Sequence, residues 1–181
     1  MAKALILLAE GFEEIEAVTV ADVLRRAEVA VTLAGLSGTT VRGAHEIVVE
    51  ADTTLDAVQG EAFDAVILPG GGPGADRLRE DARVLELLRR YAAADKWVAA
   101  ICAAPIALEA AGVIAGKRVA CYPGEELPSA KVVTEPVVRD GKIITSRGPA
   151  TALAFALELV AVLVGAEAAA MHREKMLVAA P

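Results

Sequence analysis

The chain has 181 residues, of which 55% are hydrophobic, 24% charged and 3% aromatic, and its formal net charge is −7. This composition is typical of a globular, alanine-rich chain that is long enough to bury a full core, and it excludes a disordered polymer. The negative charge and the absence of a block of Lys or Arg argue against nucleic acid and anionic membranes as partners. We expect one domain over residues 1–181, with small molecules or proteins as partners.

The sequence predicts neither a signal peptide nor a membrane span. The apolar run at residues 4–9 is short and is followed by Glu10, and Glu158 and Glu167 interrupt the longest apolar stretch near the C-terminus. We therefore expect a cytoplasmic protein whose two cysteines are thiols and not a disulfide.

The first half of the chain alternates buried-type apolar runs with segments of helical periodicity. Residues 13–27 show this periodicity most clearly, with Val20, Val23, Leu24 and Ala27 on one helix face. The expected elements are a strand at 4–9, a helix at 13–27, a strand at 29–34, a turn-rich segment at 39–49 with 47–49 extended, a strand at 65–68 and a helix at 77–94.

The second half continues the alternation and adds a hairpin. The dipeptide Asp140-Gly141 favours a tight turn between two strands. The expected elements are a strand at 98–101, a helix at 105–111 that ends at Gly112, strand pieces at 118–121, 132–138 and 142–145, and helices at 150–164 and 166–177. This order predicts an α/β fold with a mainly parallel sheet covered on both faces.

Cys102 lies between a predicted strand and a helix that Pro105 opens. Backbone N–H groups and the helix dipole at such a turn favour a thiolate over a thiol, which makes the sulfur nucleophilic and oxidisable. The alternative is a cysteine buried in the core, which is common for this residue type.

Two further segments directly follow predicted strands, so they are expected at the same edge of the sheet. Ligands bind at this edge, outside the carboxyl ends of parallel strands. One is the turn at 11–16, and the other is the glycine-rich loop at 69–74. The loop presents backbone N–H groups to a developing oxyanion, or alternatively to a phosphate, although it lacks the Gly-Lys-Ser/Thr ending of a P-loop.

Three carboxylates, those of Glu13, Glu14 and Glu16, cluster at the start of the first helix. The helix dipole alone explains acidic residues at this position. Glu16 has a second interpretation: if it points inward, burial raises its pKa and it can donate a proton to a thiolate.

Four motifs, which occur in order over nearly the whole chain, resemble the ThiJ/PfpI superfamily and in particular its parkinsonism-associated deglycase branch. The motifs are AEGFEEIE at 9–16, LPGG at 68–71, AAICAAP at 99–105 and TSRGPAT at 145–151.

The resemblance implies a flavodoxin-like three-layer sandwich, a homodimer and a cofactor-independent site. It implies that Cys102 is the nucleophile and the redox-sensitive thiol, that Glu16 is a protonated carboxyl bonded to it, and that Gly70, Gly71 and the N–H of Ala103 line the oxyanion site. The implied activities are conversion of methylglyoxal or glyoxal to hydroxy acids, removal of early glycation adducts, and chaperoning, with oxidation of the cysteine to sulfinate. The alternative function is a redox-sensing stress-response chaperone without significant turnover.

Two positions depart from the pattern of the superfamily. Tyr122 stands where many members have His, and its hydroxyl is a poor base at neutral pH, so proton transfer would depend on Glu16 or on the other subunit. His45 aligns with an Arg that approaches the partner's site, although a solvated loop residue is the simpler interpretation. Arg147, in the last motif, is expected to anchor an anionic substrate group or an interface carboxylate.

Other site classes fit the sequence less well. A glutaminase-like His-x-Glu pattern occurs at His172 and Glu174, but residues two apart on a helix do not share a face. A peptidase of the superfamily would have His directly after the cysteine, where this chain has Ala103. The two histidines are isolated and the two cysteines lack ligand spacing, so the sequence predicts no metal site.

Overall fold

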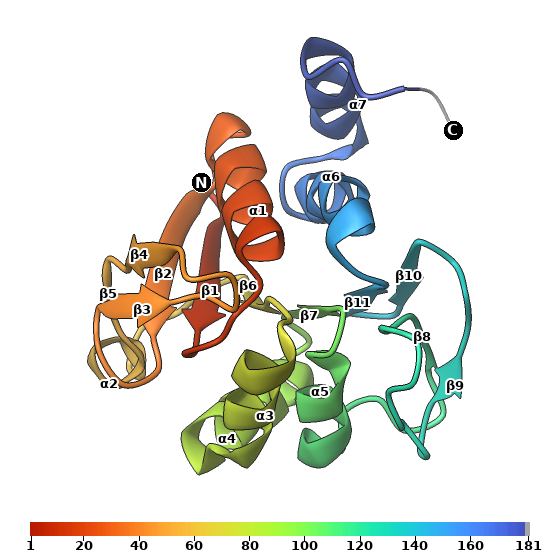
Figure 1. Ribbon diagram of the computed structural model, residues 1–181. Helices are drawn as coiled ribbons and strands as arrows, with labels where there is room; N and C mark the ends of the chain where they lie inside the picture. Colours follow the sequence, from red (N-terminus) through yellow and green to blue (C-terminus); the bar gives the residue numbers. More distant parts are fainter. Residues whose placement is uncertain (180–181) are drawn as a thin grey trace.

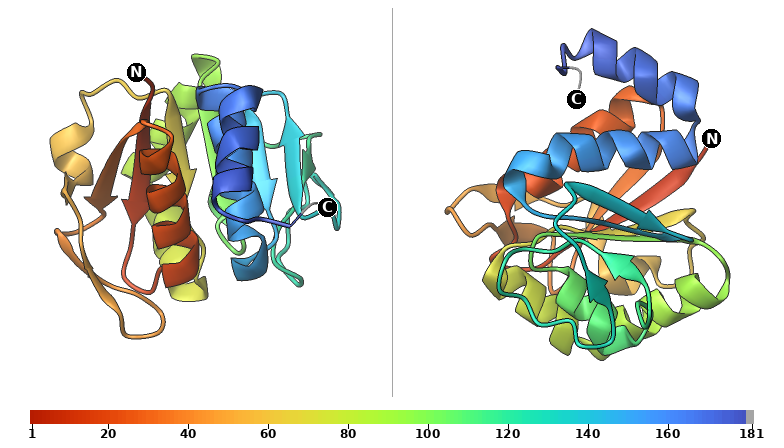
Figure 2. Two further views of the ribbon diagram at one scale, coloured as in Figure 1. Left: turned by 90° about the horizontal axis from the view of Figure 1, so that it is seen from above. Right: turned by 90° about the vertical axis from the view of Figure 1, so that its right-hand side faces the viewer.

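The computed structural model describes residues 1–179, which form a central sheet between two layers of helices (Figures 1 and 2). The sheet has seven strands in the order β10-β11-β7-β6-β1-β2-β5, and all neighbours are parallel except the pair β10 and β11. Its strands are β1 (Lys3–Leu8), β2 (Ala30–Gly35), β5 (Thr53–Thr54), β6 (Ala65–Leu68), β7 (Trp97–Ile101), β10 (Val137–Asp140) and β11 (Ile143–Ser146). The expected flavodoxin-like α/β sandwich is therefore confirmed.

The helices divide between the two faces of the sheet, as Figure 1 shows. One layer contains α1 (Glu14–Arg26), the 3₁₀ turn η1 (Pro149–Thr151), α6 (Ala152–Leu163) and α7 (Ala166–Lys175), with α7 outermost. The other layer contains α2 (Leu55–Val58), α3 (Gly72–Glu80), α4 (Ala82–Ala93) and α5 (Pro105–Ala111). Two small ribbons, β3 (Thr40–Arg42) with β4 (Val48–Glu50) and β8 (Arg118–Val119) with β9 (Lys131–Val132), lie outside the main sheet. No helix within residues 1–179 combines the length and apolarity that a membrane crossing requires.

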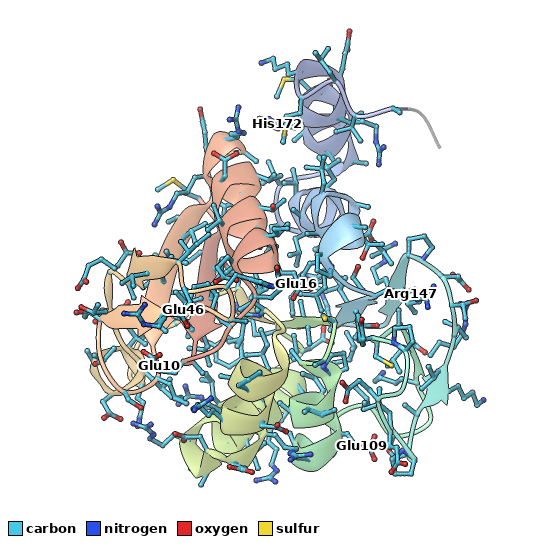
Figure 3. All side chains as sticks on the ribbon, in the orientation of Figure 1. Glu10, Glu16, Glu46, Glu109, Arg147 and His172 are labelled. Carbon is cyan, nitrogen blue, oxygen red and sulfur yellow. The ribbon has the colours of Figure 1, made fainter. Side chains whose placement is uncertain are left out.

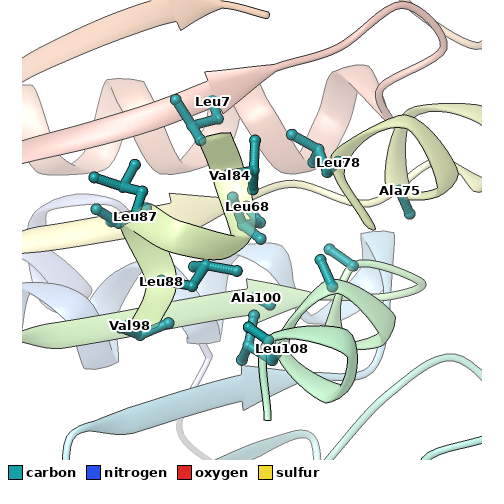
Figure 4. Close-up of a cluster of buried hydrophobic side chains, with 14 of the residues drawn as sticks. Leu7, Leu68, Ala75, Leu78, Val84, Leu87, Leu88, Val98, Ala100 and Leu108 are labelled. Atoms are coloured by element: carbon teal, nitrogen blue, oxygen red, sulfur yellow. The ribbon is translucent and has the colours of Figure 1, made fainter. Parts of the chain in front are cut away.

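Two apolar cores form because the central strands are buried on both faces. In β1, Leu5 and Leu7 face the α3–α5 layer, whereas Ile6 and Leu8 face α1 and α6. Figure 4 shows part of the first core, where side chains of β1, β6 and β7 pack against those of α3, α4 and α5. Burial on both faces explains why these strands are continuous apolar runs in the sequence and do not alternate.

The register of the sheet brings two loops together. Leu68 of β6 pairs with Ala100 of β7, so both strands end at the same edge of the sheet. The glycine-rich loop that begins at Gly70 and the turn at Cys102 therefore leave the sheet side by side.

The single helix predicted at 77–94 was wrong, because Asp81 separates α3 from α4. Asp81 has extended backbone angles, φ −84° and ψ 114°, and its side chain accepts a hydrogen bond from the N–H of Arg83. An N-cap of this kind offers the backbone an alternative to continuing the helix. The apolar periodicity does not reveal the break, since Leu78 and Val84 on its two sides face the same core.

The remaining differences concern short strands. The piece predicted at 132–138 is broken between β9 and β10, where Pro136 has no N–H for a ladder. The hairpin between β10 and β11 is confirmed, with Gly141 in the left-handed region at φ 61°. The sequence did not predict β5 and α2, which have only two and four residues.

Candidate active site

Cys102 lies on the turn between β7 and α5 and is held in an uncommon backbone conformation. Its φ is +65°, in the left-handed region that non-glycine residues rarely adopt. Its N–H donates to the carbonyl oxygen of Ser146 at 3.0 Å, and its own carbonyl oxygen accepts from the N–H of Tyr122 at 2.8 Å. These bonds to two neighbouring segments maintain a strained turn, and strain of this kind clusters at functional sites.

Glu16 is fully buried on the inner face of α1 and points to the same edge of the sheet. Its Oε2 accepts a hydrogen bond from the N–H of Gly70 at 2.7 Å, whereas its Oε1 is buried and has no hydrogen-bond partner within residues 1–179. Burial raises the pKa of Glu16 to about 7, although hydrogen bonds with Gly70 and Cys102 act in the opposite direction. The carboxyl group can therefore hold a proton near neutral pH.

Gly70 is the point at which the two side chains meet. A methyl group on its Cα would lie 2.6 Å from Cβ of Cys102, 2.7 Å from Oε2 of Glu16 and 2.9 Å from the carbonyl oxygen of Ile101. These distances are too short for any side chain, so glycine is required for the close approach of the carboxyl group and the cysteine.

The turn at 11–13 completes the convergence that the sequence predicts. The N–H of Glu13 donates to the carbonyl oxygen of Gly70 at 2.9 Å, and that of Gly74 donates to Gly11 at 3.2 Å. Gly71, at φ +88°, leaves no room for a side chain against this turn. All three loop segments that were expected at the carboxyl edge are thus in contact.

The N–H groups at the turn act on the pKa of Cys102 in the expected direction, but burial and Glu16 outweigh them. Burial raises the pKa of the Cys102 thiol to about 12, and the negative charge and hydrogen bond of Glu16 act in the same direction. The N–H groups of Gly71 and Ala103 oppose this effect but do not overcome it. A thiolate therefore forms most readily when Glu16 carries the proton, because the pair then bears one negative charge and not two.

The predicted oxyanion donors divide into two kinds. The N–H of Gly70 is already bonded to Glu16, so Gly70 positions the carboxyl group. The N–H groups of Gly71 and Ala103 instead favour negative charge on the sulfur of Cys102, and their role toward an oxyanion stays a prediction.

Tyr122 and Arg147 lie on the side of the site formed by β8 and β11. The Tyr122 side chain is half exposed, and its ring lies beside Gly148, where an added methyl group would be 3.6 Å from Cδ2. The charge of Arg147 acts on Cys121, whose pKa is raised by burial and by Glu125 and is lowered by Arg147. The roles of Tyr122 and Arg147 toward a substrate stay predictions.

His45 is exposed, but it is not a free loop residue. Its Nδ1 lies 2.8 Å from Oε2 of Glu14, and its backbone N–H donates to Oε1 of Glu14 at 2.6 Å. Burial acts to raise the pKa of Glu14, but the hydrogen bonds from His45 outweigh it and the pKa is lowered; the same contact raises the pKa of His45. Glu14 thus anchors the loop between β3 and β4 to the start of α1.

His172 lies on α7, in the outer layer, and Figure 3 shows it far from Glu16. The His-x-Glu pattern therefore plays no part at the cysteine. Two residues to which the sequence assigned no role support the site. The carbonyl oxygen of Ser146 accepts a hydrogen bond from the N–H of Cys102, and the side chain of Glu13 caps α1 by accepting one from the N–H of Glu16 at 2.8 Å. Ser146 belongs to one of the four motifs and Glu13 to another, so the motifs carried that signal.

The fold and the site together define a class: flavodoxin-like α/β proteins with a buried cysteine on a strand-to-helix turn, paired with a buried glutamic acid. The sequence profile of the DJ-1/PfpI family matches residues 2–162, and the chain belongs to this family.

Three relatives illustrate matches over most of the length of both chains. Protein dj-1beta of Drosophila melanogaster is 43% identical over 169 residues, covering 91% of this chain and 90% of the relative. The Parkinson disease protein 7 homolog of Danio rerio is 41% identical over 182 residues, covering 97% and 96%. A relative of Caenorhabditis elegans named glutathione-independent glyoxalase DJR-1.2 is 38% identical over 169 residues, covering 91% and 90%.

Solved structures agree with this assignment. The crystal structure of Drosophila melanogaster DJ-1beta superposes with a TM-score of 0.96 at 41% identity and covers 99% of both chains. Oxidised DJ-1 of Toxoplasma gondii superposes with a TM-score of 0.93 at 35% identity and covers 99% of this chain and all of its own. The predicted superfamily and its branch are thereby confirmed.

Proposed function

We propose that the chain is a cysteine-dependent, cofactor-independent enzyme that converts methylglyoxal or glyoxal to the hydroxy acid, or removes early glycation adducts by the same chemistry. The observation that carries this proposal is the pair of Cys102 and Glu16, in which a nucleophile and a proton-holding carboxyl group meet across Gly70. The relative named glutathione-independent glyoxalase supports the choice of substrate.

The pair can supply each proton transfer that methylglyoxal requires. The sulfur of Cys102 adds to the aldehyde carbon while the carbonyl oxygen takes the proton held by Glu16, which gives a hemithioacetal. The Glu16 carboxylate then removes the hydrogen from that carbon, and the proton returns to the adjacent carbon to give a thioester of lactate. Water hydrolyses the thioester and restores the thiol, so the sum is the addition of one water molecule without an oxidant.

We further propose that the protein acts as a homodimer in the cytoplasm. Large apolar side chains are exposed on α1 and β4, with Ile15 at 56%, Val18 at 51% and Val48 at 46%, which favours association through this face. Two free cysteines support a reducing compartment.

A second candidate function is the redox-sensing chaperone. The observation that favours it is the buried Oε1 of Glu16 beside Cys102, which has no hydrogen-bond partner among residues 1–179, because a protonated carboxyl group would donate a hydrogen bond to an oxidised sulfur. Under this alternative, the wild-type protein would not convert methylglyoxal, and Cys102→Ser would abolish the response to peroxide.

Lactate formation from methylglyoxal without glutathione tests the proposal. We expect turnover by the reduced wild type, loss of at least about a hundredfold in Cys102→Ser, and retention in the matched control Cys121→Ser, which removes the other buried thiol. Absence of turnover by the fully reduced wild-type protein would contradict the proposed enzymatic function and favour the redox-sensing chaperone.

A further inference from the structure

Two polar side chains that the proposed chemistry does not use are buried beside the Cys102 turn. Thr145 and Ser146, the last two residues of β11, are both fully buried, which is uncommon for hydroxyl side chains. Ser146 pairs with Ile101, the last residue of β7, so the two hydroxyl groups lie where this strand ends and the cysteine follows. Their hydrogen bonds therefore lie next to the turn that carries the thiol.

The Ser146 hydroxyl group belongs to a chain of hydrogen bonds with one direction. Its Oγ lies 2.7 Å from the carbonyl oxygen of Pro136 and 2.6 Å from Oγ1 of Thr151. Ser146 has a single hydroxyl proton and a carbonyl oxygen can only accept, so Ser146 donates to Pro136 and Thr151 donates to Ser146. Oγ1 of Thr151 in turn accepts the N–H of Gly148 at 3.1 Å. It also lies 2.9 Å from the carbonyl oxygen of Gly148, but that oxygen already accepts the N–H of Thr151 at 2.9 Å.

The two buried hydroxyl groups anchor both segments that hold the cysteine backbone. The carbonyl oxygen that accepts the N–H of Cys102 belongs to Ser146 itself, so fixing the Ser146 side chain also fixes this acceptor. Oγ1 of Thr145 accepts the N–H of Ala120 at 2.8 Å. Two residues further on, the N–H of Tyr122 donates to the carbonyl oxygen of Cys102. Each hydrogen bond of the strained turn therefore comes from a segment that a buried hydroxyl group holds.

Thr151 connects this turn to the helix layer that carries Glu16. It directly precedes α6, whose first residue, Ala152, lies in the same apolar core as Cys102 and Ala17 of α1. Ala17 is the next residue after Glu16. The Thr151 hydroxyl group thus joins the end of β11 to the layer from which the carboxyl group approaches the thiol.

We propose that Ser146 and Thr151 are positioning residues whose hydroxyl groups hold the Cys102 turn, so that the thiol stays buried against Glu16. The inference rests on the proposed function only in taking Cys102 as the reacting group. Without one of the hydroxyl groups the turn relaxes, and the burial and negative charge that raise the pKa of the thiol both weaken. Cys102 should then react faster with an alkylating agent.

Thr151→Val and Thr151→Ser are a matched pair that tests the proposal, because valine keeps the shape of threonine without the hydroxyl group and serine keeps the hydroxyl group. The reduced proteins react with iodoacetamide at mildly alkaline pH, and mass spectrometry of the peptides separates Cys102 from Cys121. We expect the Cys102 rate to rise at least about threefold in Thr151→Val and in Ser146→Ala. In Thr151→Ser it should stay at the wild-type value.

A variant in the opposite core controls for a general loss of stability. Val84 is fully buried in the core on the α3–α5 side of the sheet, so Val84→Ala weakens the fold without touching the hydroxyl groups. Its Cys102 rate should match that of the wild type. Equal or slower alkylation in Thr151→Val than in Thr151→Ser would overturn the proposal, as would the same acceleration in Val84→Ala. Alkylation does not require lactate formation, so failure of the proposed function and failure of this inference are distinguishable.

Discussion

Replacing Gly70 with alanine tests the contact on which the site depends. The new methyl group would be forced to within 2.6 Å of Cβ of Cys102 and 2.7 Å of Oε2 of Glu16, and one of them must move. Overpacking of this kind in a core costs about 1 to 3 kcal/mol of unfolding free energy. At about 2 to 4 °C per kcal/mol for a chain of this size, we expect a lower melting temperature together with loss of turnover.

Gly72→Ala is the matched control, because Gly72 lies two residues away at the start of α3 and a methyl group there would meet nothing within 4 Å. We expect Gly72→Ala to melt at or slightly above the wild-type temperature and to keep its activity. Thermal melts and lactate formation measured on both variants check the prediction. Equal stability and equal turnover in Gly70→Ala and Gly72→Ala would refute the reasoning.

Three other predictions concern the cysteine and its surroundings. The pKa of Glu16 is about 7 in the folded protein and near 4.3 in the unfolded chain, so the folded state binds the proton more tightly. The unfolding free energy should therefore fall by about 3 kcal/mol from about pH 4.5 to above pH 7. Urea denaturation of Glu16→Gln should show no such dependence of the unfolding free energy on pH. Glu16→Gln also removes the charge that opposes ionisation of Cys102, so iodoacetamide should alkylate this thiol faster than in the wild type at pH values where Glu16 is ionised; an equal or slower rate would count against charge repulsion. Tyr122→Phe should keep nearly wild-type turnover, because Tyr122 holds Cys102 through its backbone N–H, and a large loss would assign a role to the hydroxyl.

The sequence predicted secondary structure well where a single feature, such as an apolar run or a glycine at a helix end, determined it. Buried runs such as residues 65–68 became strands with the expected bounds, and Gly112 ended α5 in the left-handed conformation at φ 74°. The break at Asp81 was not predicted, because a side-chain cap competes there with an unbroken apolar periodicity.

The candidate site was predictable in its location but not in its electrostatics. The carboxyl ends of parallel strands bring the loops at Gly11, Gly70 and Cys102 together, and that convergence follows from the strand order. The raised thiol pKa does not follow from local sequence, because it arises from burial and from the charge of Glu16 on another element. The contact of His45 with Glu14 could not be predicted from local sequence either, since the two residues are 31 positions apart.

The protonation state of Glu16 tests the central claim most directly, namely that the buried carboxyl group beside Cys102 holds a proton near neutral pH. Infrared difference spectra of the wild type against Glu16→Gln isolate the carbonyl stretch of this carboxyl group across a pH titration. We predict a protonated band that disappears around pH 7. A carboxyl group that is fully ionised above about pH 5, as an ordinary glutamate is, would contradict the account.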